Sequence, residues 1–95
     1  MEYIDVTWLH QSQDDPIRLV SELDADRHEV RKLEIFRNGT VGFASQLKHS
    51  PGTQLGYGGP IPSLDEINQG VEFHAAAISA GEFEKLWAAY APTEA

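Results

Sequence analysis

The dipeptide Asn38-Gly39, with alternating apolar and polar residues on both sides, constrains the fold more than any other feature of the sequence. A two-residue type I′ hairpin turn needs positive φ at both central positions, and Asn-Gly tolerates this best. We therefore predict that residues 28–37 form a strand that pairs through this turn with the strand after it. A two-residue loop also fixes the register, giving the facing pairs Arg37/Thr40, Phe36/Val41, Ile35/Gly42 and Leu33/Ala44.

Two earlier segments also have the pattern of strands. Residues 3–9 alternate apolar and polar side chains, which is the period of a strand with one buried face. Residues 17–23 form a similar run, and turn-forming residues separate the runs at 11–16 and 24–27. The sequence therefore predicts an antiparallel meander of about four strands.

The C-terminal segment predicts an amphipathic helix that packs on one face of this sheet. Ser79 begins a capping box, and apolar residues follow it at helical spacing as far as Tyr90. In the predicted hairpin register, the small residues Gly42 and Ala44 leave a hollow on one face of the sheet. We expect Trp87 to lie near this hollow, within an α+β fold.

A second, shorter helix is predicted before the C-terminal one. Ser63 and Glu66 have the spacing of another capping box, and Gly70 is suited to end the helix. Residues 71–78 are compatible with either a short strand or an extended connection.

Length and charge limit the classes of function. The 95 residues are the size of one domain, which we expect to span residues 1–91, with 92–95 as a frayed tail. Seven basic and fifteen acidic residues give a formal charge of −8, which argues against binding to nucleic acid or to an anionic membrane. The sequence has no cysteine, no secretory signal and no membrane-spanning run, and we expect a cytoplasmic protein.

The stretch SPGTQLGYGGPIPS, residues 50–63, is rich in glycine and proline. It lacks the Gly-Lys-Ser/Thr sequence of a Walker-type loop and the glycine spacing of a dinucleotide-binding turn, so we do not expect it to hold a phosphate. Long loops without secondary structure are uncommon in compact domains and are often functional or disordered. Two interpretations stay open: a structural connection, or a binding loop in which Tyr57 contacts a partner.

The candidate catalytic residues form no recognised motif. The histidines are scattered, so we predict no metal site, and the G-x-S-x-G motif of serine hydrolases is missing. A four-residue loop at 24–27 would place Glu22 opposite Glu29, with Arg31 on the same face. Such a group is either an acid–base pair with separated pKa values or a surface ion network. We predict no cofactor.

Five motifs follow one another along residues 8–87: WLH, SELD, EVRKLEIFRNG, PSLDEIN and ISAGEFEKLW. In this order they resemble a small family of uncharacterised bacterial single-domain proteins. The resemblance implies a free-standing cytosolic domain of this size and supplies no catalytic residues. Only analogy links small acidic bacterial proteins of this kind to toxin immunity.

Two functions are compatible with these features. We expect a non-catalytic protein-interaction domain, immunity-like in its most specific form, that holds a basic protein partner. Its contacts would be residues of the turns and of the glycine-rich loop: Asp14, Asp15, Asp24, Asp26 and Tyr57. The alternative is a small enzyme or ligand-binding domain with a pocket under residues 56–59, lined by His10, Glu22, Glu29 and Arg31. Self-association through an exposed sheet edge is a third hypothesis.

Overall fold

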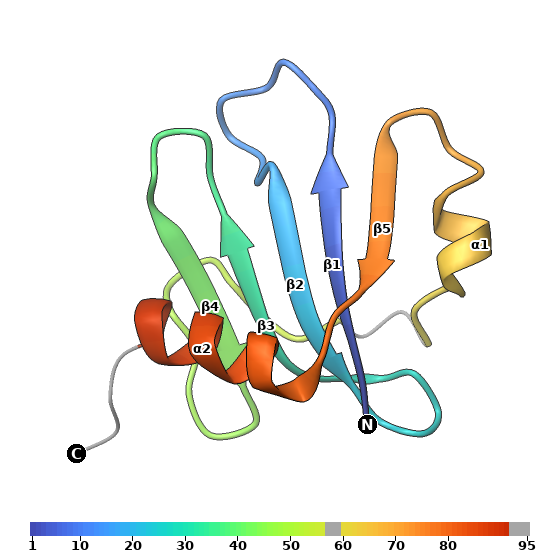
Figure 1. The fold of residues 1–95 in the computed structure, drawn as a ribbon. Coiled ribbons are helices and arrows are strands. Elements are labelled where there is room, and N and C mark those ends of the chain that lie inside the picture. Colours follow the sequence, from blue (N-terminus) through green and yellow to red (C-terminus); the bar gives the residue numbers. More distant parts are fainter. Residues whose placement is uncertain (57–59, 92–95) are drawn as a thin grey trace.

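The computed structural model describes residues 1–56 and 60–91 and shows a five-stranded antiparallel sheet with two helices (Figure 1). Its elements in chain order are β1 (Glu2–Trp8), β2 (Arg18–Leu23), β3 (Glu29–Ile35), β4 (Val41–Ser45), α1 (Leu64–Ile67), β5 (Phe73–Ala77) and α2 (Ala80–Tyr90). The predicted α+β class is confirmed. The predicted meander of about four strands is approximately right: β1 to β4 form it, and β5 adds a fifth strand to the sheet. Residues 92–95, predicted as a tail, lie outside the described part. No helix in that part is long and apolar enough to cross a membrane.

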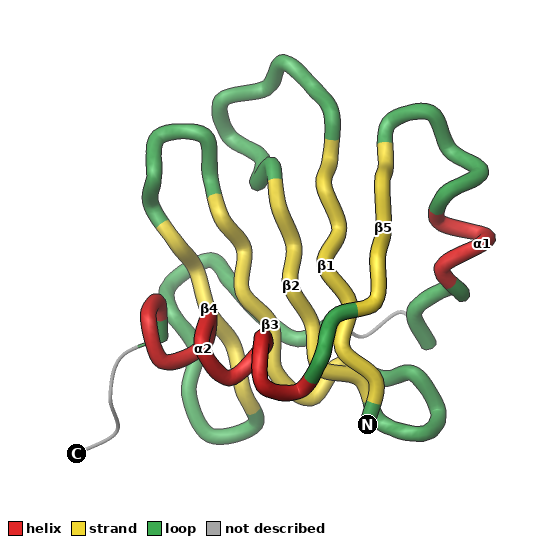
Figure 2. The backbone as a smooth tube through the Cα atoms, viewed as in Figure 1, coloured by secondary structure: helices red, strands yellow, loops and turns green. Residues whose placement is uncertain are grey.

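The strand β5 lies next to β1, although it follows β4 in the sequence; the order across the sheet is β4-β3-β2-β1-β5. After β4 the chain reaches the opposite edge, where α1 and β5 lie side by side (Figure 2). β5 pairs antiparallel with β1, from Trp8 opposite Phe73 to Ile4 opposite Ala77. Of the two interpretations left open for residues 71–78, the structure therefore contains the strand.

The two helices cover opposite faces of the sheet, and each face has its own core. On one face, Val20 and Leu33 pack with Phe83 of α2. On the other face, Leu23 belongs to a cluster against which Ile67 of α1 packs. Because side chains alternate along a strand, β2 contributes to both cores.

Both helices begin where the capping residues predict. The Ser79 hydroxyl accepts a hydrogen bond from the Glu82 N–H at 3.1 Å, and the Glu82 carboxylate accepts one from the Ser79 N–H at 3.3 Å. The Ser63 hydroxyl accepts from the Glu66 N–H at 3.2 Å, which starts the single turn of α1. These bonds satisfy N–H groups that have no partner inside a helix.

The β3–β4 hairpin forms, but its loop has three residues instead of two. The Phe36 N–H donates to the Thr40 carbonyl at 2.9 Å, and the Gly39 N–H donates to the Phe36 carbonyl at 3.0 Å. Of residues 37–39, only Gly39 has positive φ, at +90°, as in a type I turn followed by a glycine bulge. The predicted type I′ turn is therefore wrong. Asn38 closes the loop through its side chain, which accepts from the Thr40 N–H at 3.0 Å.

The longer loop shifts the register by one residue and exchanges the two faces of β4. Leu33 faces Phe43 instead of Ala44. Phe43 therefore lies on the α2 face, where its ring centroid is 6.2 Å from that of Trp87. The expectation that Trp87 lies near Gly42 and Ala44 is wrong, because these two residues face the opposite side of the sheet.

The β2–β3 pair contains a bulge. Glu22 faces Arg31 while Leu23 faces Glu29, so Val30 is the extra residue. The prediction that Glu22 faces Glu29 is therefore wrong. The bulge lets Arg31 meet Glu22 on one face of the sheet while Glu29 turns to the other face.

Candidate functional site

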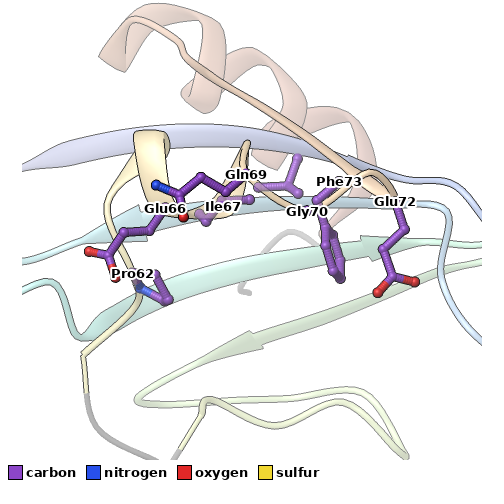
Figure 3. Close-up of a pocket in the computed structure, with 8 residues that line it drawn as sticks. Pro62, Glu66, Ile67, Gln69, Gly70, Glu72 and Phe73 are labelled. Atoms are coloured by element: carbon purple, nitrogen blue, oxygen red, sulfur yellow. The ribbon is translucent and has the colours of Figure 1, made fainter.

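An open hollow of about 520 Å³ lies between α1 and the sheet, beside β5 (Figure 3). Its floor is apolar and includes Val6, Ile67 and Phe73. Its rim carries the polar side chains of Glu66, Gln69 and Glu72. Figure 3 shows the two carboxylates at opposite ends of the hollow. Ligand pockets typically have volumes of about 300–1,000 Å³ and mostly apolar walls with a few polar groups, and the volume and lining of this hollow fall within that range.

Local bonds hold the walls of the hollow together. Asn68, which ends α1, donates to the Ala75 carbonyl at 2.9 Å and accepts from the Ala75 N–H at 2.7 Å. The Phe73 N–H donates to the Gly70 carbonyl at 3.4 Å. The Phe73 ring also stacks on Trp8, with centroids 5.6 Å apart. The floor and the α1 wall are therefore fixed relative to each other before anything binds.

The rim of the hollow is negatively charged. Within residues 1–56 and 60–91, neither Glu66 nor Glu72 forms an ion pair with a basic side chain. The Ser63 hydroxyl donates to the Glu66 carboxylate at 3.1 Å, which leaves the charge uncompensated. Sequence reasoning treated Glu66 only as a capping residue and missed this site. The available signal was weak: three of the eight residues at 65–72 are acidic, and the apolar Phe73 follows them.

Glu22 and Arg31, two of the predicted pocket residues, are brought together on the α2 face. Arg31 Nε donates to Glu22 Oε1 at 2.6 Å, and Arg31 Nη2 donates to Glu84 Oε2 at 2.7 Å. The guanidinium carbon lies 4.8 Å from the Phe83 ring centroid and 5.1 Å from that of Trp87. Hydrogen bonding to Arg31 lowers the pKa of Glu22, against the opposing effect of burial. This Arg31 cluster joins the sheet to α2, and its charged groups are already paired.

Glu29 lies on the other face, beside the glycine-rich segment. Its Oε1 accepts from the Gly56 N–H at 2.6 Å and lies 3.7 Å from Lys32 Nζ. Lys32 Nζ is also 3.4 Å from Glu34 Oε2, which completes a Lys32 cluster of two carboxylates around one ammonium. These contacts attach residue 56 to the sheet, as a structural connection would require. Tyr57 and the rest of 57–59, where the pocket was predicted, lie outside the described residues.

His10 lies just after β1 and does not meet the other predicted pocket residues. Its Nε2 is 2.8 Å from the Pro16 carbonyl, and its Nδ1 accepts from the Ser12 N–H at 3.1 Å. A carbonyl can only accept, so Nε2 carries the proton in this arrangement. The ring packs edge-on against Trp8, with centroids 4.5 Å apart. His10 therefore stabilises the β1–β2 loop.

The predicted acidic surface is divided between the two ends of the sheet. Asp14 and Asp15 lie in the β1–β2 loop, whereas Asp24 and Asp26 lie in the β2–β3 turn at the opposite end (Figure 1). The Asp24 carboxylate accepts from the N–H groups of Asp26 and His28, each at 2.9 Å. Asp24, Asp26 and His28 each offer one atom that could bind a metal ion, and these atoms lie within 4.8 Å of one another. The two backbone bonds already account for the position of Asp24, which closes the turn.

A comparison with protein families gives a match over nearly the whole chain. The family described as Domain of unknown function (DUF6881) matches residues 2–92, a range that includes every helix and strand of the structure. No curated protein and no solved structure matches the chain. The match agrees with the resemblance to an uncharacterised single-domain family. The chain therefore belongs to the DUF6881 family.

Proposed function

We propose that this chain is a non-catalytic protein-interaction domain whose α1–β5 hollow takes a basic segment of a partner protein. The observation that carries the proposal is the apolar floor bounded by Glu66 and Glu72, neither of which forms an ion pair within the described residues. A lysine or arginine of the partner pairs with either carboxylate, and an adjacent apolar side chain covers Phe73. The net charge of −8 attracts the same class of partner at longer range.

The polar clusters elsewhere in the described residues support binding over catalysis. In the Arg31 cluster and the Lys32 cluster, each carboxylate already faces a cation. A catalytic acid or base has to reach a substrate in a cleft, and ion pairing of this kind is more often structural. None of the described residues that line the hollow is a serine, threonine, histidine or lysine, and the Ser63 hydroxyl beside Glu66 is engaged as the cap of α1. This arrangement suits recognition of a cation.

The more specific form of the proposal is an immunity-like role in the bacterial cytoplasm, with Asp14, Asp15, Asp24 and Asp26 helping to hold a basic partner. Because these residues occupy opposite ends of the sheet, one short partner segment cannot contact both groups and the hollow together. We therefore assign the acidic turns to long-range attraction and the hollow to direct contact. Charges outside a contact surface act mainly on the association rate.

The test is a titration of isotope-labelled protein with synthetic peptides that place lysine or arginine beside leucine or phenylalanine. We expect amide chemical shifts to change mainly at Ile67, Gly70 and Phe73. Replacing Glu66→Gln and Glu72→Gln together should weaken binding by about tenfold or more, because neither carboxylate is left to pair with the basic side chain.

The matched control is the double variant Asp14→Asn and Asp15→Asn, which removes the same charge from a distant loop. It should bind the peptides almost as well as the wild type in high salt. Equal losses in the two double variants would contradict a defined site. Shifts at the hollow caused by a small cation such as tetramethylammonium, with none caused by the peptides, would favour the ligand-binding alternative instead.

A further inference from the structure

The outer edge of β5 carries no charged residue that would keep another strand away. Its sequence, FHAAA over Phe73–Ala77, contains no lysine, carboxylate or proline, which are the residues that usually protect an edge. β5 is the last strand on the β1 side of the sheet, so its outward N–H and C=O groups need another partner.

Asn68 bonds both backbone groups of Ala75, the central residue of this edge. Its Nδ2 donates to the Ala75 carbonyl at 2.9 Å, and its Oδ1 accepts from the Ala75 N–H at 2.7 Å. An asparagine amide carries a C=O and N–H groups like those of a peptide unit. These two bonds therefore reproduce the pair that a residue of a sixth strand would make with Ala75.

The opposite edge, at β4, is covered by the chain that follows it. The Ser50 N–H donates to the Phe43 carbonyl at 2.9 Å, and the Ser45 N–H donates to the Lys48 carbonyl at 2.7 Å. The β4 edge is thus covered by backbone. The β5 edge is covered by the end of α1 and the residues after it: the Asn68 side chain makes both bonds to Ala75, and the Gly70 carbonyl accepts from the Phe73 N–H at 3.4 Å.

We propose that Asn68 holds the α1 segment against the edge of β5 and so prevents β5 from pairing with β5 of a second copy of this chain. An antiparallel pair centred on Ala75 of each copy places Phe73 opposite Ala77 and His74 opposite Ala76. Neither two bulky side chains nor two like charges then face each other, so the edge is complementary to itself. This role concerns the edge of the sheet and does not depend on peptide binding in the hollow.

The test compares the wild type with Asn68→Ala by amide hydrogen exchange and by sedimentation velocity over a range of concentrations. We expect a wild-type monomer in which the Ala75 amide is protected. In Asn68→Ala, at concentrations where it is still monomeric, exchange of the Ala75 amide should accelerate by about fivefold to tenfold, the factor that corresponds to one net hydrogen bond. A dimer should appear as the concentration rises. Asn38→Ala is the control, since it removes another side chain that bonds the backbone of a loop, and it should stay monomeric.

Two more variants keep the test decisive. If Asn68→Ala does not fold, Asn68→Asp takes its place in the test. It retains the acceptor for the Ala75 N–H but loses the donor, so it should give the same changes to a smaller extent. Adding Ala77→Lys to the associating variant places a charge on the edge and should restore the monomer. A wild-type dimer, a folded Asn68→Ala that stays monomeric at every concentration, or a dimer that survives Ala77→Lys would each overturn the proposal.

Discussion

Arg31 faces Glu22 directly across the β2–β3 pair, and its guanidinium also lies 4.8 Å from the centroid of the Phe83 ring. One side chain therefore joins two strands of the sheet to α2. The side chains of Arg31 and Glu22 are only 20% and 8% exposed. Since charge interactions are stronger where water is excluded, the attachment of α2 should depend on this pair.

We predict that Arg31→Ala lowers the free energy of unfolding by about 3 kcal/mol, because it leaves the buried Glu22 carboxylate without its closest cation. Urea unfolding followed by tryptophan fluorescence measures the change. The control is Arg37→Ala, which removes an exposed arginine that donates to the His10 carbonyl and should cost less than about 1 kcal/mol. Similar costs for the two variants would mean that the Arg31 cluster is no more important than a surface contact.

Acid should weaken the same cluster. Hydrogen bonding to Arg31 lowers the pKa of both Glu22 and Glu84 below the ordinary glutamate value. The unfolded chain therefore binds protons at a higher pH than the folded one, and the free energy of unfolding falls as the pH drops below about 5, through the lowered pKa values. In Glu22→Gln, the urea midpoint measured from about pH 7 to about pH 3 should fall less steeply than in the wild type. An unchanged slope would assign the acid sensitivity to other carboxylates.

Gly42 should tolerate no side chain, because a Cβ there would lie 2.0 Å from the Thr53 hydroxyl oxygen. We expect Gly42→Ala to destabilise the protein by about 1–3 kcal/mol, since β4 or the segment over it has to move. Adding Thr53→Ala removes that oxygen and should recover part of the loss. A double-mutant cycle based on thermal unfolding measures the coupling, and strictly additive effects would contradict it.

Phe83 is the side chain through which α2 contributes most to the core. It is fully buried against Val20 and Leu33. We predict that Phe83→Ala costs about 3–5 kcal/mol in chemical unfolding, as large aromatic deletions in cores do. Tyr90→Ala, at a position that is 43% exposed on the same helix, is the comparison and should cost far less. If both variants unfold at the same urea concentration, α2 is not anchored through Phe83.

The acidic turns should affect how fast a basic partner arrives more than how long it stays. We expect the combined changes of Asp14, Asp15, Asp24 and Asp26 to asparagine to slow association with the basic peptides at low salt and to leave the dissociation rate nearly unchanged. Stopped-flow fluorescence or surface plasmon resonance at two salt concentrations separates the two rates. A large rise in the dissociation rate would place these carboxylates in the contact surface itself.

The strands of the meander and the long helix could be predicted because their signals are local. The alternation in residues 3–9 and the capping box at Ser79 each depend on side chains a few positions apart. The loop at Asn38 shows the limit of such signals. Two- and three-residue hairpin loops both favour Asn-Gly, and the choice depends on which register packs better beneath α2. Phe43 on the α2 face fills space that Ala44 would leave empty.

The candidate site was harder to predict from the sequence, because it depends on contacts between distant parts of the chain. Val6 and Phe73 reach the same hollow only because β5 pairs with β1. The sequence of β5, FHAAA, is too short to specify β1 as its partner. The bulge at Val30 could not be predicted either. Its one extra residue turns Glu29 to the other face of the sheet and so separates it from Glu22 and Arg31, with which it was predicted to form a polar group.

Because β2 supplies alternate residues to two cores, the family should tolerate changes in chain length very unevenly. Val20 and Glu22 point to α2, while Ser21 and Leu23 point to α1. Inserting one residue before Val20 would exchange these sets and turn the Glu22 carboxylate toward the apolar cluster on the α1 face. The same slip in β5 would keep alanine at only two of its five positions and would turn Phe73 away from Trp8 and the hollow. Insertions and deletions among relatives should therefore accumulate in loops, while β2 and β5 keep their length.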